Sequence, residues 1–96
     1  MPRPLLTEPE IAEALKAVAW ARDGDRLTKQ VTLDDFRGSM AFVTDVAEVA
    51  EELNHHPDIS ISWNKVGLEV STHDSGGLTS LDFELARRVD ALDPSR

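Results

Sequence analysis

The 96-residue sequence contains no cysteine, few aromatic residues and a deficit of basic residues. Without cysteine the chain has neither a disulfide framework nor thiolate chemistry. Ten Lys and Arg stand against 18 Asp and Glu, and the formal charge of −8 argues against direct binding to nucleic acid or to an anionic membrane surface. No apolar run approaches the ~20 residues of a membrane span, and residues 1–7 lack the apolar core of a signal peptide. We therefore expect a cytoplasmic protein with a small or neutral ligand.

The chain length fits one domain, which we expect to span residues 1–96. A domain of this size buries about 60–70% of the surface that its unfolded chain exposes, so its core is modest. Association between subunits would help to stabilise such a core, and an oligomer is therefore a reasonable expectation.

Three segments begin like helices, each with a threonine followed three residues later by an acidic residue, the spacing of a capping box. The pairs are Thr7 and Glu10, Thr32 and Asp35, and Thr79 and Asp82. The apolar periodicity that follows predicts a first helix after Thr7, a long helix over residues 33–54 and a last helix over residues 80–92.

Two hairpins are expected between these helices. Residues 18–22 and 26–31 flank the turn signal Asp23-Gly24-Asp25. Residues 59–63 and 66–71 alternate between apolar and polar side chains on either side of an expected turn at Asn64-Lys65. The order α-β-β-α-β-β-α predicts an α+β fold in which helices cover one face of an antiparallel sheet.

The long helix carries two apolar stripes. The first consists of Phe36, Met40, Val43, Ala47 and Ala50, and the second of Phe42, Val46, Val49 and Leu53. One stripe can cover the sheet, but the other has no obvious partner within so small a chain. We predict that whichever stripe of helix 33–54 does not cover the sheet contacts another subunit.

All three histidines lie between Glu51 and Asp82. Because its unperturbed pKa is near neutrality, histidine can give or take a proton without much tuning. His55 and His56 stand where the long helix meets Pro57, and His73 stands where a strand meets a glycine-rich loop. Element ends are where functional side chains are usually displayed. If both hairpins share a sheet, these ends could face one cleft.

The neighbouring residues have competing interpretations. Three histidines could hold a zinc ion, but His55 and His56 are adjacent and tend to point apart, so no metal is expected. Asp82 is explained by capping, with fixing the His73 loop as a second task. Glu51 is either part of a solvated face or, since it lies one helical turn before His55, an orienting partner for an imidazole.

The tryptophans raise a similar question. Trp63 is expected in the core together with Phe83. Trp20 is either a core residue or a stacking wall for a flat ligand, and the sequence leaves both open.

These residues resemble the signature of the pterin-4a-carbinolamine dehydratases, in which an acidic residue, His-His-Pro, an aromatic residue, a third histidine and a downstream Asp follow at set spacings. The slots are filled by Glu51, His55-His56-Pro57, Trp63, His73 and Asp82. The resemblance covers about residues 10–92. It implies a four-stranded antiparallel sheet with three helices on one side, and a homodimer or homotetramer assembled with help from the long helix.

The resemblance also implies an activity: loss of water from a 4a-hydroxytetrahydropterin, which recycles the cofactor of aromatic amino-acid hydroxylases without a cofactor of the dehydratase's own. His55 and His73 would transfer protons, and His56 would mainly bind and orient the pterin. The substrate-binding set implied in this way is Glu51, Asn54, His55, His56, Pro57, Thr72, His73, Asp74 and Ser75, with Asp82, Trp20 and Trp63 as structural support.

Two other functions stay open: a non-catalytic role as a dimerisation or transcriptional coactivator, and pterin handling linked to molybdopterin. The sequence also departs from animal members of the family at two positions. Asn54 stands where they commonly carry Asp, and Leu81 where they often carry a basic residue.

Overall fold

The computed structural model describes residues 3–92, so both ends of the domain expected over residues 1–96 lie outside the described residues. The elements follow in the order α1 (Glu8–Leu15), β1 (Ala21–Asp23), β2 (Arg26–Thr32), α2 (Phe36–Leu53), β3 (Asp58–Ser62), β4 (Lys65–Val70), the 3-10 turn η1 (His73–Ser75) and α3 (Ser80–Asp90). The predicted α+β class and the order α-β-β-α-β-β-α are confirmed.

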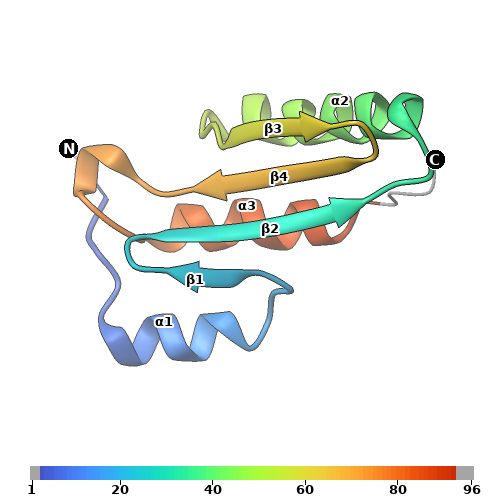
Figure 1. Ribbon diagram of the computed structural model, residues 1–96. Coiled ribbons are helices and arrows are strands. Elements are labelled where there is room, and N and C mark those ends of the chain that lie inside the picture. Colours follow the sequence, from blue (N-terminus) through green and yellow to red (C-terminus); the bar gives the residue numbers. More distant parts are fainter. Residues whose placement is uncertain (1–2, 93–96) are drawn as a thin grey trace.

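The four strands form one antiparallel sheet in the order β1-β2-β4-β3 (Figure 1). The central pair joins the two hairpins, with β2 and β4 in register from Leu27 opposite Val70 to Thr32 opposite Lys65. Both hairpins therefore share a sheet. This is the condition under which the histidines after α2 and the histidine after β4 could meet.

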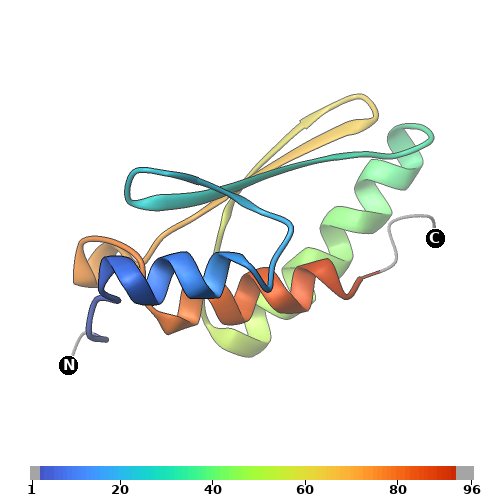
Figure 2. The ribbon, with the colours of Figure 1, turned by 90° about the horizontal axis from the view of Figure 1, so that it is seen from below.

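Strand alternation decides which face of the sheet the helices cover. Leu27, Val66, Leu68 and Val70 point to one face and are buried there, and all three helices lie on that side of the sheet (Figure 2). Side chains from α2 and α3 complete the core: Phe42, Val46, Val49, Phe83, Leu85, Ala86 and Val89. Each large apolar side chain buried in this way contributes roughly 1.5–3 kcal/mol.

Two of the three expected helix caps are confirmed. Thr7 with Glu10 and Thr79 with Asp82 both form capping boxes. The expected cap at Thr32 is wrong, because Thr32 pairs with Lys65 as the last residue of β2. Asp35 begins the long helix instead, and its Oδ1 accepts the backbone N–H of Gly38 at 2.8 Å.

Other boundaries also shift. The strand expected over residues 18–22 is found at Ala21–Asp23, since backbone hydrogen bonds of the turns that end α1 hold residues 16–18. The last helix ends at Asp90 rather than at residue 92.

The tryptophans separate into one core residue and one surface residue. Trp20 is buried, and its indole N–H donates to Asp90 Oδ1 at 3.0 Å, so it is not a stacking wall for a ligand. The core assignment of Trp63 is wrong: its side chain is 65% exposed, whereas Phe83 is 1% exposed as expected. The β3–β4 turn falls on Trp63-Asn64 instead of Asn64-Lys65, and Trp63 takes a positive φ of 53° there.

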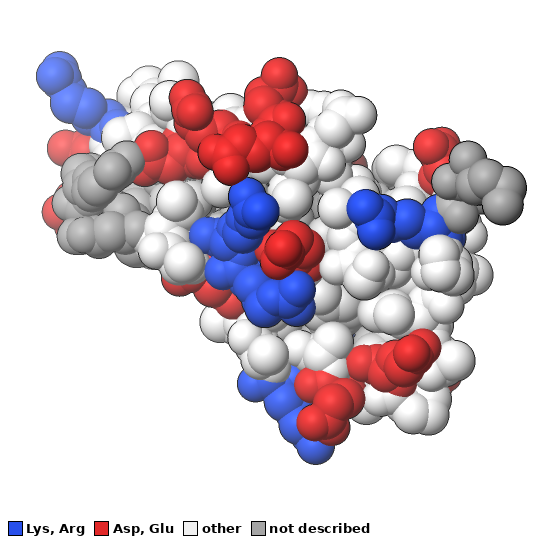
Figure 3. Space-filling view, turned by 180° about the vertical axis from the view of Figure 1, so that it is seen from behind, with Lys and Arg blue, Asp and Glu red and all other residues white. Residues whose placement is uncertain are grey.

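The two stripes of α2 have different fates. Phe42, Val46 and Val49 of the second stripe are buried, whereas Phe36 and Met40 of the first are 52% and 44% exposed. The outer, helical side of the molecule carries acidic side chains over α2 and basic side chains gathered over α3 (Figure 3). Among residues 3–92, none of the helices combines the length and apolar character needed to cross a membrane.

Candidate active site

The end of α2 directs the histidine pair away from the helix. Asn54 caps the helix in the left-handed conformation (φ 50°, ψ 45°), a geometry that Asn tolerates better than most residues. The backbone N–H of His55 then returns to the carbonyl of Ala50 at 3.0 Å. This turn allows the adjacent imidazoles of His55 and His56 to take different partners.

His55 is paired with the buried carboxylate of Asp82. Its Nε2 lies 2.6 Å from Asp82 Oδ1, and the two side chains are 11% and 0% exposed. The other oxygen of Asp82 accepts the hydroxyl of Thr72 at 2.8 Å and the backbone N–H of Thr79 at 2.9 Å. The expectation that Asp82 caps α3 is correct, but the same carboxylate also holds a site histidine.

His56 is paired with Glu51 on the surface. Its Nε2 lies 2.6 Å from Glu51 Oε2, and both side chains are more than half exposed. Glu51 therefore orients an imidazole, as one of the two readings of the sequence expected. That imidazole belongs to His56, whereas the expectation rested on the helical spacing to His55.

His73 is carried by a short closed loop after β4. The carbonyl of Thr72 accepts the backbone N–H groups of Ser75 and Gly76, each at 3.0 Å, and Gly76 turns the chain with φ 78°. His73 is exposed, and its ring makes no hydrogen bond with the described residues. Its ring is therefore accessible to a ligand or to solvent.

The segments that follow α2 and β4 line an open cavity of about 270 Å³. It is lined by Asn54, His55, His56, Ser71, Thr72, His73 and Asp74. The structure thus brings the three sequence-predicted histidines together, along with Asn54, Thr72 and Asp74. Pro57 and Ser75 do not line this cavity, and the Ser75 hydroxyl donates to the carbonyl of Arg3.

Ser71 is a lining residue that the sequence reasoning missed. The signal was available, because strand alternation places Ser71 on the same face as His73.

A smaller hollow adjoins the cavity at His56, Ser71 and His73 and adds Arg26, Asp58 and Glu69. These three come from different strands, so only the sheet register could have brought them in. The hydrogen bond from Arg26 to Glu69 at 3.0 Å raises the pKa of that guanidinium further above its ordinary value.

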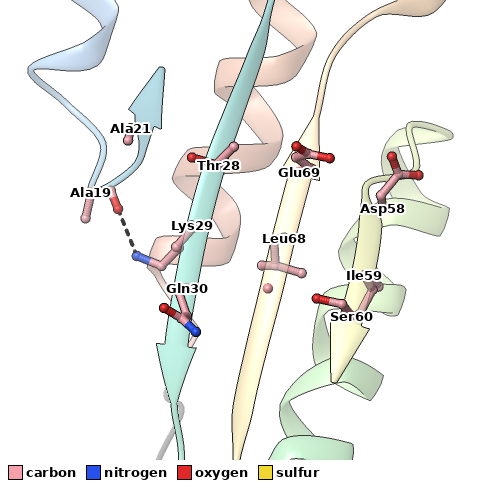
Figure 4. Close-up of a pocket in the computed structure, with 11 residues that line it drawn as sticks. Ala19, Ala21, Thr28, Lys29, Gln30, Asp58, Ile59, Ser60, Leu68 and Glu69 are labelled. Carbon is pink, nitrogen blue, oxygen red and sulfur yellow. Dashed lines mark hydrogen bonds between the residues drawn. The ribbon is translucent and has the colours of Figure 1, made fainter. Parts of the chain in front are cut away.

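A larger hollow lies elsewhere, on the uncovered face of the sheet. It measures about 620 Å³ and has no histidine in its lining. The side chains of Thr28, Gln30, Ser60 and Glu69 stand on this face, and Lys29 donates to the carbonyl of Ala19 at 3.1 Å (Figure 4). We place the candidate site at the cavity lined by the three histidines, because that is where groups able to transfer protons converge.

Within the described residues, no three His, Cys, Asp or Glu side chains are arranged to hold a metal ion. His55 and His56 direct their Nε2 atoms to carboxylates on different helices. What the site offers chemically is three imidazoles on one cavity. One is anchored by a buried carboxylate, one is paired with an exposed carboxylate, and the third has no partner among the described residues.

The class of protein is thus an α+β domain in which three helices cover one face of an antiparallel sheet. A histidine cluster lies where the segments that follow α2 and β4 meet. The sequence profile described as pterin 4 alpha carbinolamine dehydratase matches residues 4–92. The chain belongs to this family.

Similar proteins come from different organisms. A protein of Roseiflexus castenholzii named "Putative pterin-4-alpha-carbinolamine dehydratase" is 47% identical over 89 residues, which are 92% of this chain and 96% of that protein. A protein of Nocardia farcinica with the same name is 45% identical over 89 residues, covering 92% and 94% of the two chains.

Solved structures resemble the fold as well. The crystal structure of a transcriptional coactivator/pterin dehydratase from Brucella melitensis matches with a TM-score of 0.86 and 34% identity, over 91% of this chain and 96% of that one. A pterin dehydratase-like protein described as a RuBisCO assembly factor in the alpha-carboxysome matches with a TM-score of 0.63 and 24% identity, over 82% and 92% of the chains. At that identity the second match speaks for the fold alone.

Proposed function

We propose that this protein removes water from a 4a-hydroxytetrahydropterin to give the quinonoid dihydropterin. The observation that carries the proposal is the cavity shared by the imidazoles of His55 and His73, one anchored to Asp82 and the other free. Family membership supplies the substrate class, which the geometry alone does not.

The reaction requires two proton transfers and no redox step. The bond between C4a and the hydroxyl oxygen breaks, and that oxygen takes a proton and leaves as water. The proton on N5 is lost, and the electron pair of the N5–H bond forms the double bond between N5 and C4a. A positioned acid and a positioned base each contribute about 10²–10⁴-fold to such a step.

The surroundings of the two rings suggest how the roles divide. A carboxylate beside an imidazole orients it and stabilises the positive charge that it gains as a base. His55, with Asp82 at 2.6 Å, suits removal of the N5 proton. His73, exposed and without a partner among the described residues, suits delivery of a proton to the leaving hydroxyl. His56 and Asn54 would bind the pterin.

The charges near the cavity favour a pterin without a phosphate group. Besides His56 and His73, the adjoining hollow is lined by one basic side chain, Arg26, and two acidic ones, Asp58 and Glu69. Arg26 is already paired with Glu69. This balance disfavours an anionic substituent, and it argues for recycling of a neutral pterin over handling of molybdopterin. An aromatic amino-acid hydroxylase encoded near this protein's gene would support the recycling pathway.

The test is a stopped-flow dehydration assay with chemically generated 4a-hydroxytetrahydropterin. We expect the wild type to accelerate dehydration, and His55→Ala and His73→Ala each to lower kcat by about 10²–10⁴-fold. His56→Gln should mainly raise KM, because its proposed role is binding.

Circular dichroism must show that each variant keeps the native fold. Thr44→Val, an exposed change on α2, serves as a control and should retain full activity. Full activity in the His55→Ala/His73→Ala double variant would overturn the mechanism.

A further inference from the structure

A buried chain of hydrogen bonds connects the segment that carries His73 to the ring of His55. Thr72, Thr79 and Asp82 are 8%, 0% and 0% exposed. The hydroxyls of Thr72 and Thr79 lie 2.8 Å apart, and the Thr72 hydroxyl is 2.8 Å from Asp82 Oδ2. Every buried side-chain nitrogen and oxygen of the described residues has a hydrogen-bond partner.

The donor and the acceptor of each hydrogen bond among Thr72, Thr79 and Asp82 follow from the number of protons that each group carries. A hydroxyl has one proton to donate, and Thr72 donates its proton to Asp82. Thr72 must therefore accept the proton of the Thr79 hydroxyl, which in turn accepts the backbone N–H of Leu81. Asp82 Oδ2 is then occupied by two donors, the Thr72 hydroxyl and the Thr79 N–H. Oδ1 is left for His55.

This arrangement determines the tautomer of His55. A carboxylate that accepts every other hydrogen bond requires a donor at His55, so Nε2 carries the proton. Nδ1 makes no hydrogen bond with the described residues, and it is not a buried unpartnered atom. Nδ1 therefore reaches the surface, and His55 is one of the residues that line the cavity.

Thr72 also anchors the loop of His73 through its backbone. Its N–H donates to the carbonyl of Gly77 at 3.0 Å, and its carbonyl accepts from Ser75, Gly76 and Gly77. One residue thus holds the start of the loop with its backbone and the partner of His55 with its side chain.

We propose that Thr72 is a positioning residue: its hydroxyl aligns Asp82 so that His55 presents Nδ1 to the cavity, at a fixed place relative to His73. The hydroxyl is used twice inside the protein and is not free to bind substrate. The proposal deepens the proposed function and rests on it only for the catalytic consequence.

The direct test is the ring proton of His55, observed by ¹⁵N and ¹H NMR of histidine-labelled protein. Signals are assigned with His56→Gln and His73→Gln. In the wild type we expect a downfield Nε2 proton that exchanges slowly with water. Thr72→Val, which keeps the shape and removes the hydroxyl, should make this proton exchange fast, and Thr72→Ser should restore slow exchange. Thr44→Val is the matched control and should leave the signal unchanged.

The same variants are tested for dehydration. Loss of a group that orients a metal-binding side chain typically costs about 10–100-fold, and we expect a loss of similar size for an orienting group here. Thr72→Val should therefore lower kcat by at least about tenfold with little change in KM. Thr72→Ser should recover most of the rate.

The two proposals fail in different ways. An unprotonated Nε2 or a fast-exchanging ring proton in the wild type overturns the role of Thr72 whatever the activity, and this outcome does not require the Thr72 variant to fold. A signal and a kcat that are both unchanged in Thr72→Val overturn it as well. A wild type that shows the slow proton but does not accelerate dehydration refutes the proposed function and leaves the positioning of His55 intact.

Discussion

At the scale of single residues, two aspartates of α3 hold together parts of the chain that are distant in sequence. Asp82 joins α3 to the end of α2 through His55 and to the end of β4 through Thr72. Asp90 Oδ2 accepts the backbone N–H of Ala19 at 2.7 Å, and its Oδ1 lies 3.1 Å from Lys29 Nζ. With the indole of Trp20, this second carboxylate fastens the entry of β1 to the last turn of α3.

We predict that Asp90→Ala lowers the free energy of unfolding by about 2–3 kcal/mol. The variant leaves the backbone N–H of Ala19 and the indole N–H of Trp20 without their acceptor, and the Lys29 amine without its charge partner. Urea unfolding followed by tryptophan fluorescence measures this difference. The control is Asp34→Ala, an exposed aspartate that makes no hydrogen bond with the described residues. Equal unfolding midpoints for the two variants would contradict the role of Asp90.

Residue roles differed in how far they could be predicted. The capping task of Asp82 follows from local spacing to Thr79, so the sequence was enough. Its contact with His55 spans 27 residues and depends on how α3 packs against α2. The exposure of Trp63 depends on a positive φ in the β3–β4 turn, which alternation along the strand does not reveal.

At the scale of elements, α1 depends on carboxylates that are held ionised. The backbone and hydroxyl of Thr7 lower the pKa of Glu10 below its ordinary 4.5. Hydrogen bonds from Arg22 likewise lower the pKa of Glu8. α1 is therefore capped at Thr7 and tied to β1 by groups that titrate in the acid range.

These depressed values give stability a pH dependence. Because the unfolded state binds protons more readily, the contribution of each carboxylate is present above pH 4.5 and is lost as the pH falls through the lower folded pKa. We predict that Glu10→Gln lowers the melting temperature at neutral pH and that wild type and variant converge at acid pH. Thermal melts followed by circular dichroism across this range test the sign, and a gap that widens on acidification would refute it.

Element boundaries show the same division between local and tertiary signals. Thr7 and Thr79 cap helices because neither residue lies in a strand. Thr32 has the same local spacing to Asp35, but pairing with Lys65 extends β2 through it. Hydrogen bonds across a sheet therefore override a local helix-start signal.

At the scale of the whole molecule, the domain leaves an apolar surface uncovered. Phe36 and Met40 of the first α2 stripe are exposed, and so is Trp63. The Trp63 turn lies beside this end of α2, since the Ser39 hydroxyl donates to the Trp63 carbonyl at 2.7 Å. The sequence predicted that one α2 stripe lacks a partner, and the packing of Phe42 and Val46 into the core decides which one it is.

We predict a dimer or tetramer at micromolar concentration that forms through this stripe. Met40→Glu should shift the protein towards the monomer, because association would bury its charge. Ala41→Glu is the matched control, since it adds the same charge at the next, exposed position of α2. Light scattering coupled to size-exclusion chromatography measures the mass, and a strictly monomeric wild type would exclude this interface.

The meeting of the histidines is also a property of the whole molecule. From the sequence we expected His55 and His56 at the end of a helix and His73 at the end of a strand. We expected these ends to meet only if both hairpins share a sheet. Pairing of β2 with β4 satisfies that condition. The particular partners could not be predicted, because they depend on packing between α2, α3 and the loop of η1.

The segment before α1 lies against the loop that carries His73. The N–H of Leu6 donates to the carbonyl of Leu78 at 3.0 Å, and the backbone carbonyl of Arg3 accepts a hydrogen bond from the Ser75 hydroxyl. A side chain at Gly77 would come within 3.1 Å of Leu5. An affinity tag or fusion partner placed before Arg3 therefore starts next to the candidate site, whereas one placed after α3 starts from the end of that helix opposite Asp82. Activity measurements on tagged protein should use the second arrangement.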